Sequence, residues 1–353
     1  MEKSQRYKVG EKYIGEGEPC FIIAEAGLNH NGDSEIAKKL ILNAKECGAD
    51  AIKFQKRNIE DILVKKALDA PYDSPNAFAP TYGEHRNKLE LSKEIWLDLK
   101  KFADENKIIF FASPWDIKSA DFLEDLGVPL YKIASADLTN LPLLEHLAKK
   151  GKPLILSTGM STLEEVDEAV NLILKFNQQL ILMHCVSDYP CEDDKVNLRM
   201  ISTLIERYKL PVGYSGHESG IAIPVAARAL GAVAIEKHFT LSRAMKGSDH
   251  AGSLEPEGLR RLVKYIRKNV EPALGDGIKK FTEMERKMRI KLAKSLASTC
   301  PIPQGTLISA DMLTIKGPGD GLKPSMANQV IGKIAKNQIL ADQIIKEDDI
   351  HWA

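Results

Sequence analysis

Short apolar runs alternate along the chain with stretches of helical periodicity. Eight such runs lie at 21–24, 51–55, 108–112, 130–133, 153–156, 180–183, 212–214 and 234–236. Between them, segments such as 34–47 and 162–177 repeat apolar residues at the spacing of an amphipathic helix. Continuous apolar strands that alternate with helices are typical of a parallel sheet buried on both faces. The pattern predicts an α/β fold, a closed (β/α)8 TIM barrel, and leaves a doubly wound open sheet as the alternative.

The end of the chain has a different composition. A strongly charged helical stretch at 279–295 is followed by short β-like runs and by turn sequences such as PQG and GPGDG. A barrel uses about 250 residues. Since the chain has 353, we predict a barrel domain over 1–280, a linker over 281–294 and a small β-rich domain over 295–353. So small a domain buries little core alone, and we expect it to pack on something else, such as a partner subunit's barrel.

One connection stands out from the rest of the predicted barrel. The segment 57–91 is rich in Pro, Tyr, Asn and Asp. Connections in α/β units usually span only a few residues, so this one is too long for an ordinary barrel loop. We expect it to form a rim or lid loop.

Charge and cysteine usage narrow the class of protein. Lys and Arg total 49 and Asp and Glu total 49, so no broad field attracts nucleic acid or anionic lipid, and any anion site must be local. The five cysteines are odd in number, widely spaced and lack a CxxC pair, which argues against disulfides and cysteine zinc sites. The first residues are polar and no apolar run approaches the length of a membrane span. We expect a cytoplasmic protein that binds neither nucleic acid nor membrane.

Polar residues follow the predicted strands, and barrel enzymes build their active sites at these carboxyl ends. His217 and His238 follow two successive strands, so both imidazoles are expected at one barrel mouth, where neutral nitrogens bind a divalent transition metal. The alternative is a pair of structural histidines with satisfied hydrogen bonds. Glu236 lies on the same strand face as His238. It has three interpretations: a third metal ligand, a residue that supports the ligands, or an ordinary residue of the barrel interior.

Two lysines also end predicted strands. A buried lysine at a barrel mouth is costly unless an anion partners it, which makes Lys53 and Lys132 candidates to bind a substrate anion. The alternative for Lys53 is a structural salt bridge with Glu25 or Asp137. The strand ends also carry side chains that would complete a phosphate and carboxylate cradle: Gln55, Ser135, Ser157 and Ser215.

Two carboxylates complete the candidate site. Glu25 and Asp137 end different strands, as general acid and base chemistry or activation of a metal-bound water requires. A Cys-His nucleophile is not expected from His184 and Cys185, because adjacent side chains on a strand face opposite ways.

Eight collinear motifs then resemble the sialic acid synthase family in order and spacing. They are AEAGLNHNGD, IKFQ, FFASPWD, YKIASADLTNLPLLE, PLILSTGMSTLEE, HCVSDYP, VGYSGHESG and IEKHFTLSRAMKGSDHAGSLEP. The resemblance covers about residues 18 to 275. The tail from about Ser295 resembles that family's antifreeze-like domain, of the SAF type. Nearly the whole chain is therefore accounted for.

The resemblance implies an activity and a role for each candidate residue. The family condenses phosphoenolpyruvate with an open-chain N-acyl amino sugar, releases phosphate by C–O cleavage, and so makes a nine-carbon keto-sugar acid. By motif, His217 and His238 match the manganese ligands, with magnesium or cobalt as alternative metals, and Glu25 matches the acid near the metal. The set that matches the phosphoenolpyruvate site is Lys53, Gln55, Lys132, Ser135, Ser157 and Ser215. The positions that match the sugar site are Tyr189, Asp249 and Trp115, although Trp115 could equally be core.

Three departures from the family pattern affect which of the family's residue roles can be assigned to this sequence. Ala136 and Asp137 stand where the family usually has Gly-Glu, and Gly216 stands where an aspartate usually precedes the metal histidine. Gly317 stands where the family's arginine reaches into the partner's active site to contact the sugar, with Lys316 or Lys323 as the available replacements. The resemblance nevertheless implies a homodimer in which each tail swaps onto the partner's barrel mouth.

Other functions stay open at this point. A related synthase could act on a phosphorylated sugar, for which Arg243 and Lys246 are the available basic residues. A degenerate barrel that only binds sugars is a second alternative, against which both lysines and both histidines argue. A structural or ice-binding protein, based on the tail alone, would leave the polar strand ends unexplained. The identity of the amino sugar and of the physiological metal is not given by these patterns.

Overall fold

The computed structural model describes residues 5–352. Contacts within the chain divide it into two compact units, the first ending at Gly275 and the second beginning at Asp276. Each unit has its own hydrophobic core and is described by itself.

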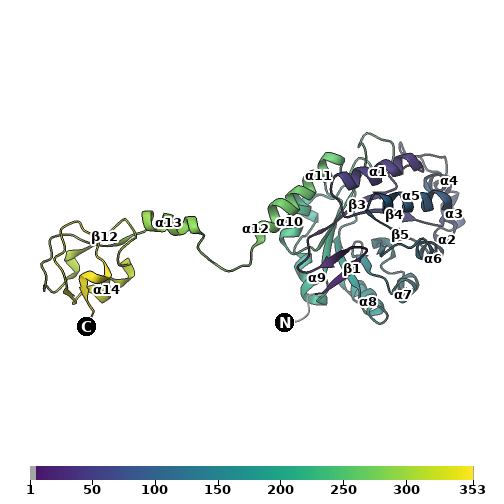
Figure 1. The fold of residues 1–353 in the computed structure, drawn as a ribbon. Helices are drawn as coiled ribbons and strands as arrows, with labels where there is room; N and C mark the ends of the chain where they lie inside the picture. Colours follow the sequence, from purple (N-terminus) through teal and green to yellow (C-terminus); the bar gives the residue numbers. More distant parts are fainter. Residues whose placement is uncertain (1–4, 353) are drawn as a thin grey trace. The chain divides into compact units, whose positions relative to one another are not determined.

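The first unit is a closed barrel of eight parallel strands surrounded by helices (Figure 1). Its strands are β3 (Phe21–Gly27), β4 (Ala51–Lys56), β5 (Ile109–Pro114), β6 (Tyr131–Ile133), β7 (Leu154–Ser157), β8 (Leu180–Cys185), β9 (Val212–Gly216) and β10 (Ala234–His238). Each pairs with its sequence neighbour, and β10 closes on β3. The predicted barrel is confirmed, and the open-sheet alternative is wrong.

The helices around the barrel form for the reasons that the sequence pattern gave. In α8 (Leu163–Leu174), Thr162 and Glu165 form a capping box, and one face of the helix is buried through Val166, Ala169, Val170 and Ile173. The other barrel helices are α1 (Ser34–Glu46), α5 (Lys93–Glu105), α6 (Ile117–Asp125), α7 (Leu141–Lys149), α9 (Met200–Tyr208), α10 (Ala222–Ala229), α11 (Pro256–Lys264), the π-helix η3 (Tyr265–Val270) and α12 (Glu271–Leu274).

A short hairpin precedes the barrel. Strands β1 (Arg6–Val9) and β2 (Lys12–Gly15) pair antiparallel. The side chains of Val9 and Ile14 are fully buried, and Lys12 pairs with Asp50, which directly precedes β4. The hairpin therefore lies at the amino-terminal end of the strands, opposite the end that carries the polar residues. The sequence pattern suggested only a polar start here.

The segment 57–91 is more ordered than the rim or lid loop that we predicted. It contains α2 (Ile59–Ile62), α3 (Lys65–Leu68) and α4 (Tyr82–Leu89). Thr81 caps α4 through the backbone of Glu84, and the ring of His85 packs against Tyr72 at 4.5 Å between centroids. These local caps and ring contacts, rather than apolar periodicity, stabilise the segment.

The second unit has a small β-rich fold. It contains α13 (Glu283–Leu292), β11 (Ser295–Ser298), β12 (Leu313–Lys316), α14 (Ala327–Val330), β13 (Ile334–Ala335) and β14 (Ile350–His351). The strands form two antiparallel pairs. Its core includes Leu296, Ile302, Ile308, Ile339 and Ile345, all at most 1% exposed.

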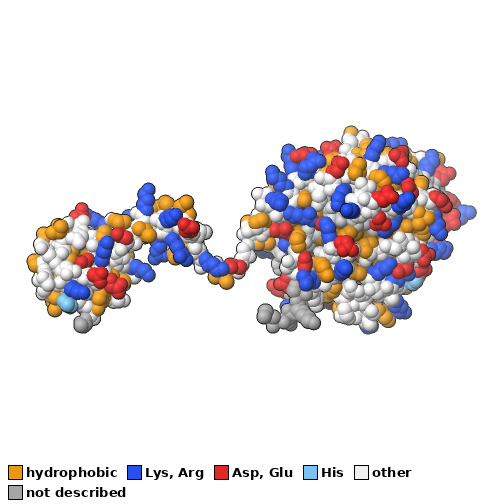
Figure 2. All heavy atoms as spheres, viewed as in Figure 1, with side chains coloured by type: hydrophobic (Ala, Val, Ile, Leu, Met, Phe, Trp, Pro, Cys, Tyr) orange, Lys and Arg blue, Asp and Glu red, His pale blue; other side chains and the backbone are white. Residues whose placement is uncertain are grey.

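Basic and acidic side chains are mixed over the face of the barrel unit that Figure 2 shows. Within residues 5–352, no helix combines the length and the apolar character that crossing a membrane requires. An anion site on this unit has to be made by particular side chains rather than by an overall field.

Candidate active site

A cavity of about 550 Å³ opens at the carboxyl ends of the barrel strands. It brings together every predicted site residue except Asp137. Its lining includes Glu25, Lys53, Gln55, Trp115, Lys132, Ser135, Ser157, Tyr189, Ser215, His217, His238 and Asp249.

The floor of this cavity is a cluster of four buried charges. Lys53 Nζ lies 2.7 Å from Glu25 Oε2 and 3.4 Å from Glu236 Oε1. Lys132 Nζ lies 3.4 Å from the same Glu236 oxygen. All four side chains are at most 5% exposed. Strand register explains the cluster, because Glu25 is paired with Lys53 between β3 and β4, and Glu236 is paired with Ser215 between β9 and β10.

The two lysines differ electrostatically. Burial acts to lower the pKa of Lys53, but the carboxylates of Glu236 and Glu25 outweigh it and raise that pKa above its ordinary value. For Lys132 burial dominates, and its pKa lies below the ordinary value. Lys132 shares its single carboxylate with Lys53, so an anionic ligand would stabilise its charged form most.

Several polar atoms in the cavity have no partner. Ser157 Oγ and Glu236 Oε2 are buried and make no hydrogen bond, whereas Ser135 Oγ accepts one from the backbone of Gly159 at 3.1 Å. Gln55 Nε2 donates to Glu25 Oε1 at 2.8 Å and so holds that carboxylate in place. Buried polar groups are normally satisfied, so the unpartnered atoms indicate that a polar ligand completes this site.

The two histidines lie side by side, with ring centroids 5.4 Å apart. His217 Nδ1 is 2.7 Å from the carbonyl oxygen of Val186, which makes Nδ1 the donor and leaves the lone pair on Nε2. Burial, together with His238, lowers the pKa of His217 to about 3, so its ring is neutral. His238 Nδ1 is buried without a hydrogen bond. Two adjacent imidazoles, one oriented by a backbone carbonyl and one with an unpartnered nitrogen, fit a divalent metal.

Glu236 does not join the histidines in a three-residue metal site. Its Oε1 receives contacts from Lys53, Lys132 and Ser215. Burial raises the pKa of Glu236, but Lys132 and Lys53 outweigh it and hold that pKa low. In the described part of the chain, no group of three His, Cys, Asp or Glu side chains is placed to hold a metal ion. Glu236 is an anionic partner of the two lysines, a role that was not among the three interpretations drawn from the sequence.

The predicted sugar-site residues lie next to the histidines. The ring of Tyr189 is 4.0 Å from that of His217, and Asp249 Oδ2 is 3.9 Å from His238 Nδ1. Trp115 lines the cavity instead of lying in the core. As predicted, His184 and Cys185 point apart. His184 Nε2 lies 2.6 Å from the carbonyl oxygen of Val196, while Cys185 lines the cavity.

Comparison with known proteins identifies the family. The NeuB family model matches residues 40–279, and the SAF domain model matches residues 293–351. The chain belongs to the NeuB family. The predicted resemblance to sialic acid synthases with an SAF domain is confirmed.

Three relatives show how far the similarity to the NeuB family extends. Human N-acetylneuraminate-9-phosphate synthase is 42% identical over 339 residues, 96% of this chain and 94% of its own. N,N'-diacetyllegionaminic acid synthase from Campylobacter jejuni is 42% identical over 335 residues, 92% of this chain and 98% of its own. A crystal structure of N-acetylneuraminic acid synthetase from Leptospira borgpetersenii, in complex with citrate, has a TM-score of 0.72 and 38% identity, and covers 81% of this chain and 95% of that one.

This NeuB-family site has one member that does not lie where we expected it. Asp137 lines an adjoining cavity of about 710 Å³. Its Oδ1 accepts a hydrogen bond from Asn140 at 3.3 Å, and its Oδ2 has no partner. The side chain sits on a short 3-10 turn after β6, Ser135–Asp137, which carries Ser135 into the first cavity and Asp137 into the second.

The burial of Asp137 predicts how the stability of the protein changes with pH. Burial raises the pKa of Asp137 to about 6, so the folded protein binds this proton more tightly than the unfolded chain. The carboxyl therefore lowers stability progressively as pH rises from about 4 to about 6, and its full penalty applies above pH 6. We expect Asp137→Asn to be more stable by on the order of 2 kcal/mol at pH 8 and unchanged near pH 4.

Urea unfolding of both proteins across this pH range measures the effect of Asp137→Asn. The exposed Asp125 offers a control, because a surface substitution such as Asp125→Asn should change stability by less than about 0.5 kcal/mol. Equal stability of Asp137→Asn and the unchanged protein at pH 8 would contradict the assigned burial penalty.

A buried ion pair, which the sequence patterns did not reveal, supports the two histidines. Lys237 Nζ donates to the Glu218 backbone oxygen at 2.6 Å and to its Oε1 at 2.9 Å, and Tyr214 Oη donates to Glu218 Oε2 at 2.6 Å. A Cβ on Gly216 would lie 2.5 Å from that same Oε2. The Glu218 carboxylate thus fills the space that a side chain at 216 would need, which explains the glycine.

This pair ties together the strand ends that carry the histidines, since Glu218 follows His217 and Lys237 precedes His238. We expect Glu218→Gln to leave Lys237 uncompensated, to destabilise the protein by about 3–5 kcal/mol, and to weaken manganese binding if the two histidines hold that ion as hypothesised. Tyr214→Phe is the matched control, since it removes one hydrogen bond for about 1–3 kcal/mol. Chemical unfolding and manganese titration measure both. A Glu218→Gln variant as stable as Tyr214→Phe would show that the pair is dispensable.

Proposed function

We propose that this chain is a nonulosonic acid synthase, a transferase that joins phosphoenolpyruvate to an open-chain N-acyl amino sugar and releases phosphate. The observation that carries the proposal is one cavity in which a buried cluster of two lysines and two carboxylates lies beside a pair of adjacent histidines. The names of its relatives, which include synthases of sialic and legionaminic acids, support the same chemistry.

The lysine cluster is suited to bind phosphoenolpyruvate. The formal charges of Lys53 and Lys132 are balanced by those of Glu25 and Glu236, so a further anion needs extra cationic or hydrogen-bonding support. Ser135, Ser157, Ser215 and the amide of Gln55 offer donors around the lysines. We assign the phosphate and carboxylate of phosphoenolpyruvate to this cradle.

The histidines are the proposed metal site. His217 and His238 would hold a divalent ion, manganese first, with magnesium or cobalt as alternatives. When bound, such an ion supplies Lewis-acid polarisation of the sugar's aldehyde and added positive charge. The side chains of Tyr189, Asp249 and Trp115 surround this end of the cavity and are assigned to the sugar.

The bond changes in the proposed reaction balance with one water. C3 of phosphoenolpyruvate attacks the aldehyde carbon, whose oxygen gains a proton, and water adds to the oxocarbenium-like C2 and loses a proton. The tetrahedral carbon then expels phosphate with the electrons of its C–O bond and loses its hydroxyl proton to become the ketone. Glu25, held by Gln55 and Lys53, is the group assigned to these proton transfers. Asp137 is the second candidate, in contact with the adjoining cavity.

We further propose that the SAF domain acts in trans, covering the barrel mouth of a second subunit in a homodimer. Gly317 stands at the position of the family's arginine, and Lys316 or Lys323 would have to replace it. Lys316 pairs with Asp342 of its own domain, so Lys323 is the better candidate. Light scattering during turnover tests the proposal. A dimer is expected, and a fully active monomer would contradict it.

The substrate test is a panel of N-acetylated hexosamines, free and 6-phosphorylated, incubated with phosphoenolpyruvate and manganese. Phosphate and keto acid should appear in equal amounts with one sugar. If metal binds but no sugar in the panel reacts, an unusual acceptor sugar or a sugar-binding barrel without catalysis becomes the better account.

A further inference from the structure

The two buried lysines of the active-site cluster are not equally well paired. Lys53 Nζ lies 2.7 Å from Glu25 Oε2 and donates to Ser113 Oγ at 3.3 Å. Among the described residues, Lys132 Nζ has one hydrogen-bonding partner, Glu236 Oε1 at 3.4 Å, and Lys53 Nζ lies equally far from that same oxygen. A lysine ammonium group carries three donors. Lys132 is 3% exposed, so its ammonium form is buried with most of its donors unsatisfied.

Electrostatics favour the neutral amine of Lys132. Burial lowers the pKa of Lys132, and the nearby charge of Lys53 acts in the same direction. Glu236, Cys185 and Glu25 act in the opposite direction without restoring the ordinary pKa. Desolvation and a neighbouring cation are two means by which proteins make a lysine amine nucleophilic. Lys132 therefore differs from Lys53, whose pKa is raised.

The surroundings of Lys132 include a free hydroxyl group. Lys132 lines the active-site cavity together with Ser157. In the pairing of β6 with β7, Lys132 lies opposite Ile155, and Ser157 is two residues further along β7, on the same face of the sheet. Ser157 Oγ is buried without a hydrogen-bond partner. A carbonyl group bound in this part of the cavity would therefore meet an amine and a free hydroxyl donor together.

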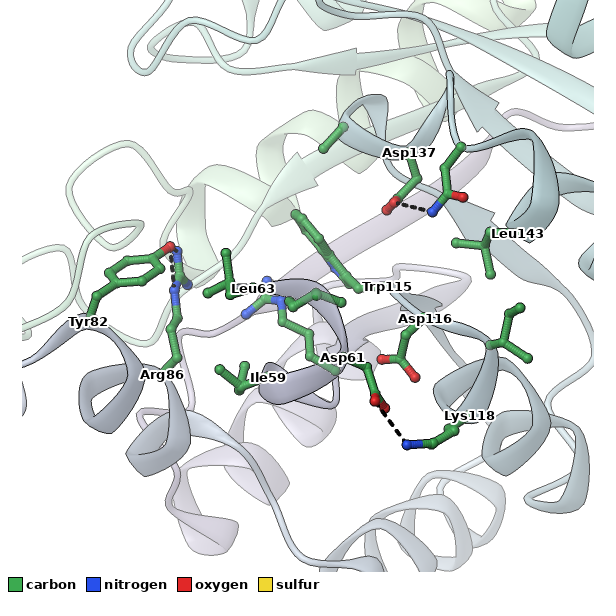
Figure 3. Close-up of a pocket in the computed structure, with 15 residues that line it drawn as sticks. Ile59, Asp61, Leu63, Tyr82, Arg86, Trp115, Asp116, Lys118, Asp137 and Leu143 are labelled. Carbon is green, nitrogen blue, oxygen red and sulfur yellow. Dashed lines mark hydrogen bonds and ion pairs between the residues drawn. The ribbon is translucent and has the colours of Figure 1, made fainter. Parts of the chain in front are cut away.

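The other candidate carboxylate of the site does not reach Lys132. Asp137 lies in the adjoining cavity, which Figure 3 shows, and accepts a hydrogen bond from Asn140 there. Lys132 does not line that cavity. Glu236 is thus the carboxylate in contact with Lys132, and Lys53 competes for it.

We propose that Lys132 is a nucleophilic lysine that captures small 2-keto acids, of which pyruvate is the simplest, as an imine at their C2 carbon. The carboxylate of the keto acid occupies the place assigned above to the carboxylate of phosphoenolpyruvate, so this inference rests on the proposed function. The ketone then lies beside the amine of Lys132 and the hydroxyl of Ser157.

The capture balances without a further reactant. The nitrogen of the neutral amine forms a bond to C2 of the keto acid. Its two hydrogens leave with the former carbonyl oxygen as one water, and a C=N double bond replaces the C=O bond. Nothing is oxidised or reduced, and addition of water reverses the capture. The unpartnered hydroxyl of Ser157 is the donor assigned to the carbonyl oxygen during the attack.

Phosphoenolpyruvate escapes this capture for two reasons. Its C2 carries a phosphate ester and a C=C double bond and is not a ketone. Its phosphate also adds negative charge beside Lys132, which favours the ammonium form. A keto acid brings only its carboxylate, and Lys53, with its raised pKa, is the cation that pairs with it. Lys132 therefore acts as a cation toward phosphoenolpyruvate and as a nucleophile toward keto acids.

Reductive trapping on the full-length protein tests the proposal. The protein is incubated with pyruvate and sodium cyanoborohydride, which converts an imine into a stable amine, and mass spectrometry of the digested protein locates the added group. One pyruvate per chain is expected, on Lys132 and not on Lys53. Lactate, which has the carboxylate without the ketone, should give no adduct. Phosphoenolpyruvate at about ten times its Kd should reduce the labelling of Lys132 roughly 10-fold.

Lys101 is the matched control for labelling. Its side chain, on helix α5, is 77% exposed, so it reports the background reaction of a surface lysine. Lys132→Gln should lose the adduct and keep the background at Lys101, with thermal unfolding as the check that the variant is folded. The position of the adduct in the unchanged protein provides a readout that depends on no variant.

The outcomes separate the imine site from the synthase function. No adduct, an adduct on Lys53 or Lys101 in preference to Lys132, or full labelling in the presence of phosphoenolpyruvate would overturn the imine site. Phosphate release from phosphoenolpyruvate in the sugar panel is an independent readout. Its absence, with Lys132 labelled and protected as expected, would overturn the synthase function and leave the imine site in place.

Discussion

Replacing Lys53 by Met is expected to give the largest combined loss of stability and activity. Lys53 is 2% exposed and lies between Glu25 and Glu236. Removal of its ammonium leaves two buried carboxylates with only Lys132 as a cation, which should destabilise the protein by about 3–5 kcal/mol. Phosphate release should fall by roughly 10²–10³, the effect of removing one preorganised group that stabilises a transition-state charge. Urea unfolding and a phosphate assay measure the two effects.

A second variant separates structural from catalytic effects. In Lys53→Met with Glu25→Gln, the unpaired charge is removed, and most of the lost stability should return. Activity should stay low, because both the cation and the proposed proton carrier are gone. If the double variant regained activity together with stability, the cluster would be structural, and the phosphoenolpyruvate cradle would have to lie elsewhere.

Replacing either His217 or His238, the two residues proposed to bind the metal, by Ala is expected to abolish the proposed metal-dependent phosphate release. Changes to residues that merely orient a ligand commonly reduce metal affinity or activity 10- to 100-fold, so loss of His217 or His238 itself should exceed roughly 100-fold. Calorimetric titration with manganese and the phosphate assay provide independent readouts.

The matched control for these variants is His146→Ala. This histidine pairs with Asp121 at 2.6 Å on the outside of the barrel and does not line the cavity. The His146→Ala variant should bind manganese and release phosphate as the unchanged protein does. Full manganese affinity in both His217→Ala and His238→Ala would show that the metal is held by other residues.

The barrel could be predicted because each strand is a short apolar run buried on both faces. All eight runs correspond to observed strands within a few residues, and the polar residues after them line one cavity, as the geometry of parallel strands requires. Asp137 was the exception. A 3-10 turn follows β6, so alternation along the strand no longer determines where that side chain points.

The remaining parts depend on contacts that periodicity does not encode. The helices within 57–91 are stabilised by the Thr81 cap and by ring packing around His85. Neither contact follows from apolar periodicity, so the sequence did not predict that Arg86 lines the cavity. The burial of Lys237 was detectable in principle, since it precedes His238 in a buried strand and needs an anion. Its partner, Glu218, lies beyond the end of the neighbouring strand, where sequence pairing rules do not apply.

The most direct test of the synthase assignment follows the bridging oxygen of phosphoenolpyruvate. The substrate is labelled with oxygen-18 between C2 and phosphorus, and the protein is supplied with manganese and the amino sugar that reacts in the panel. Mass spectrometry then locates the label. C–O cleavage predicts that the label appears in the released phosphate and is absent from the keto-sugar acid. Label retained in the keto group, with unlabelled phosphate, would mean P–O cleavage and would contradict the proposed reaction.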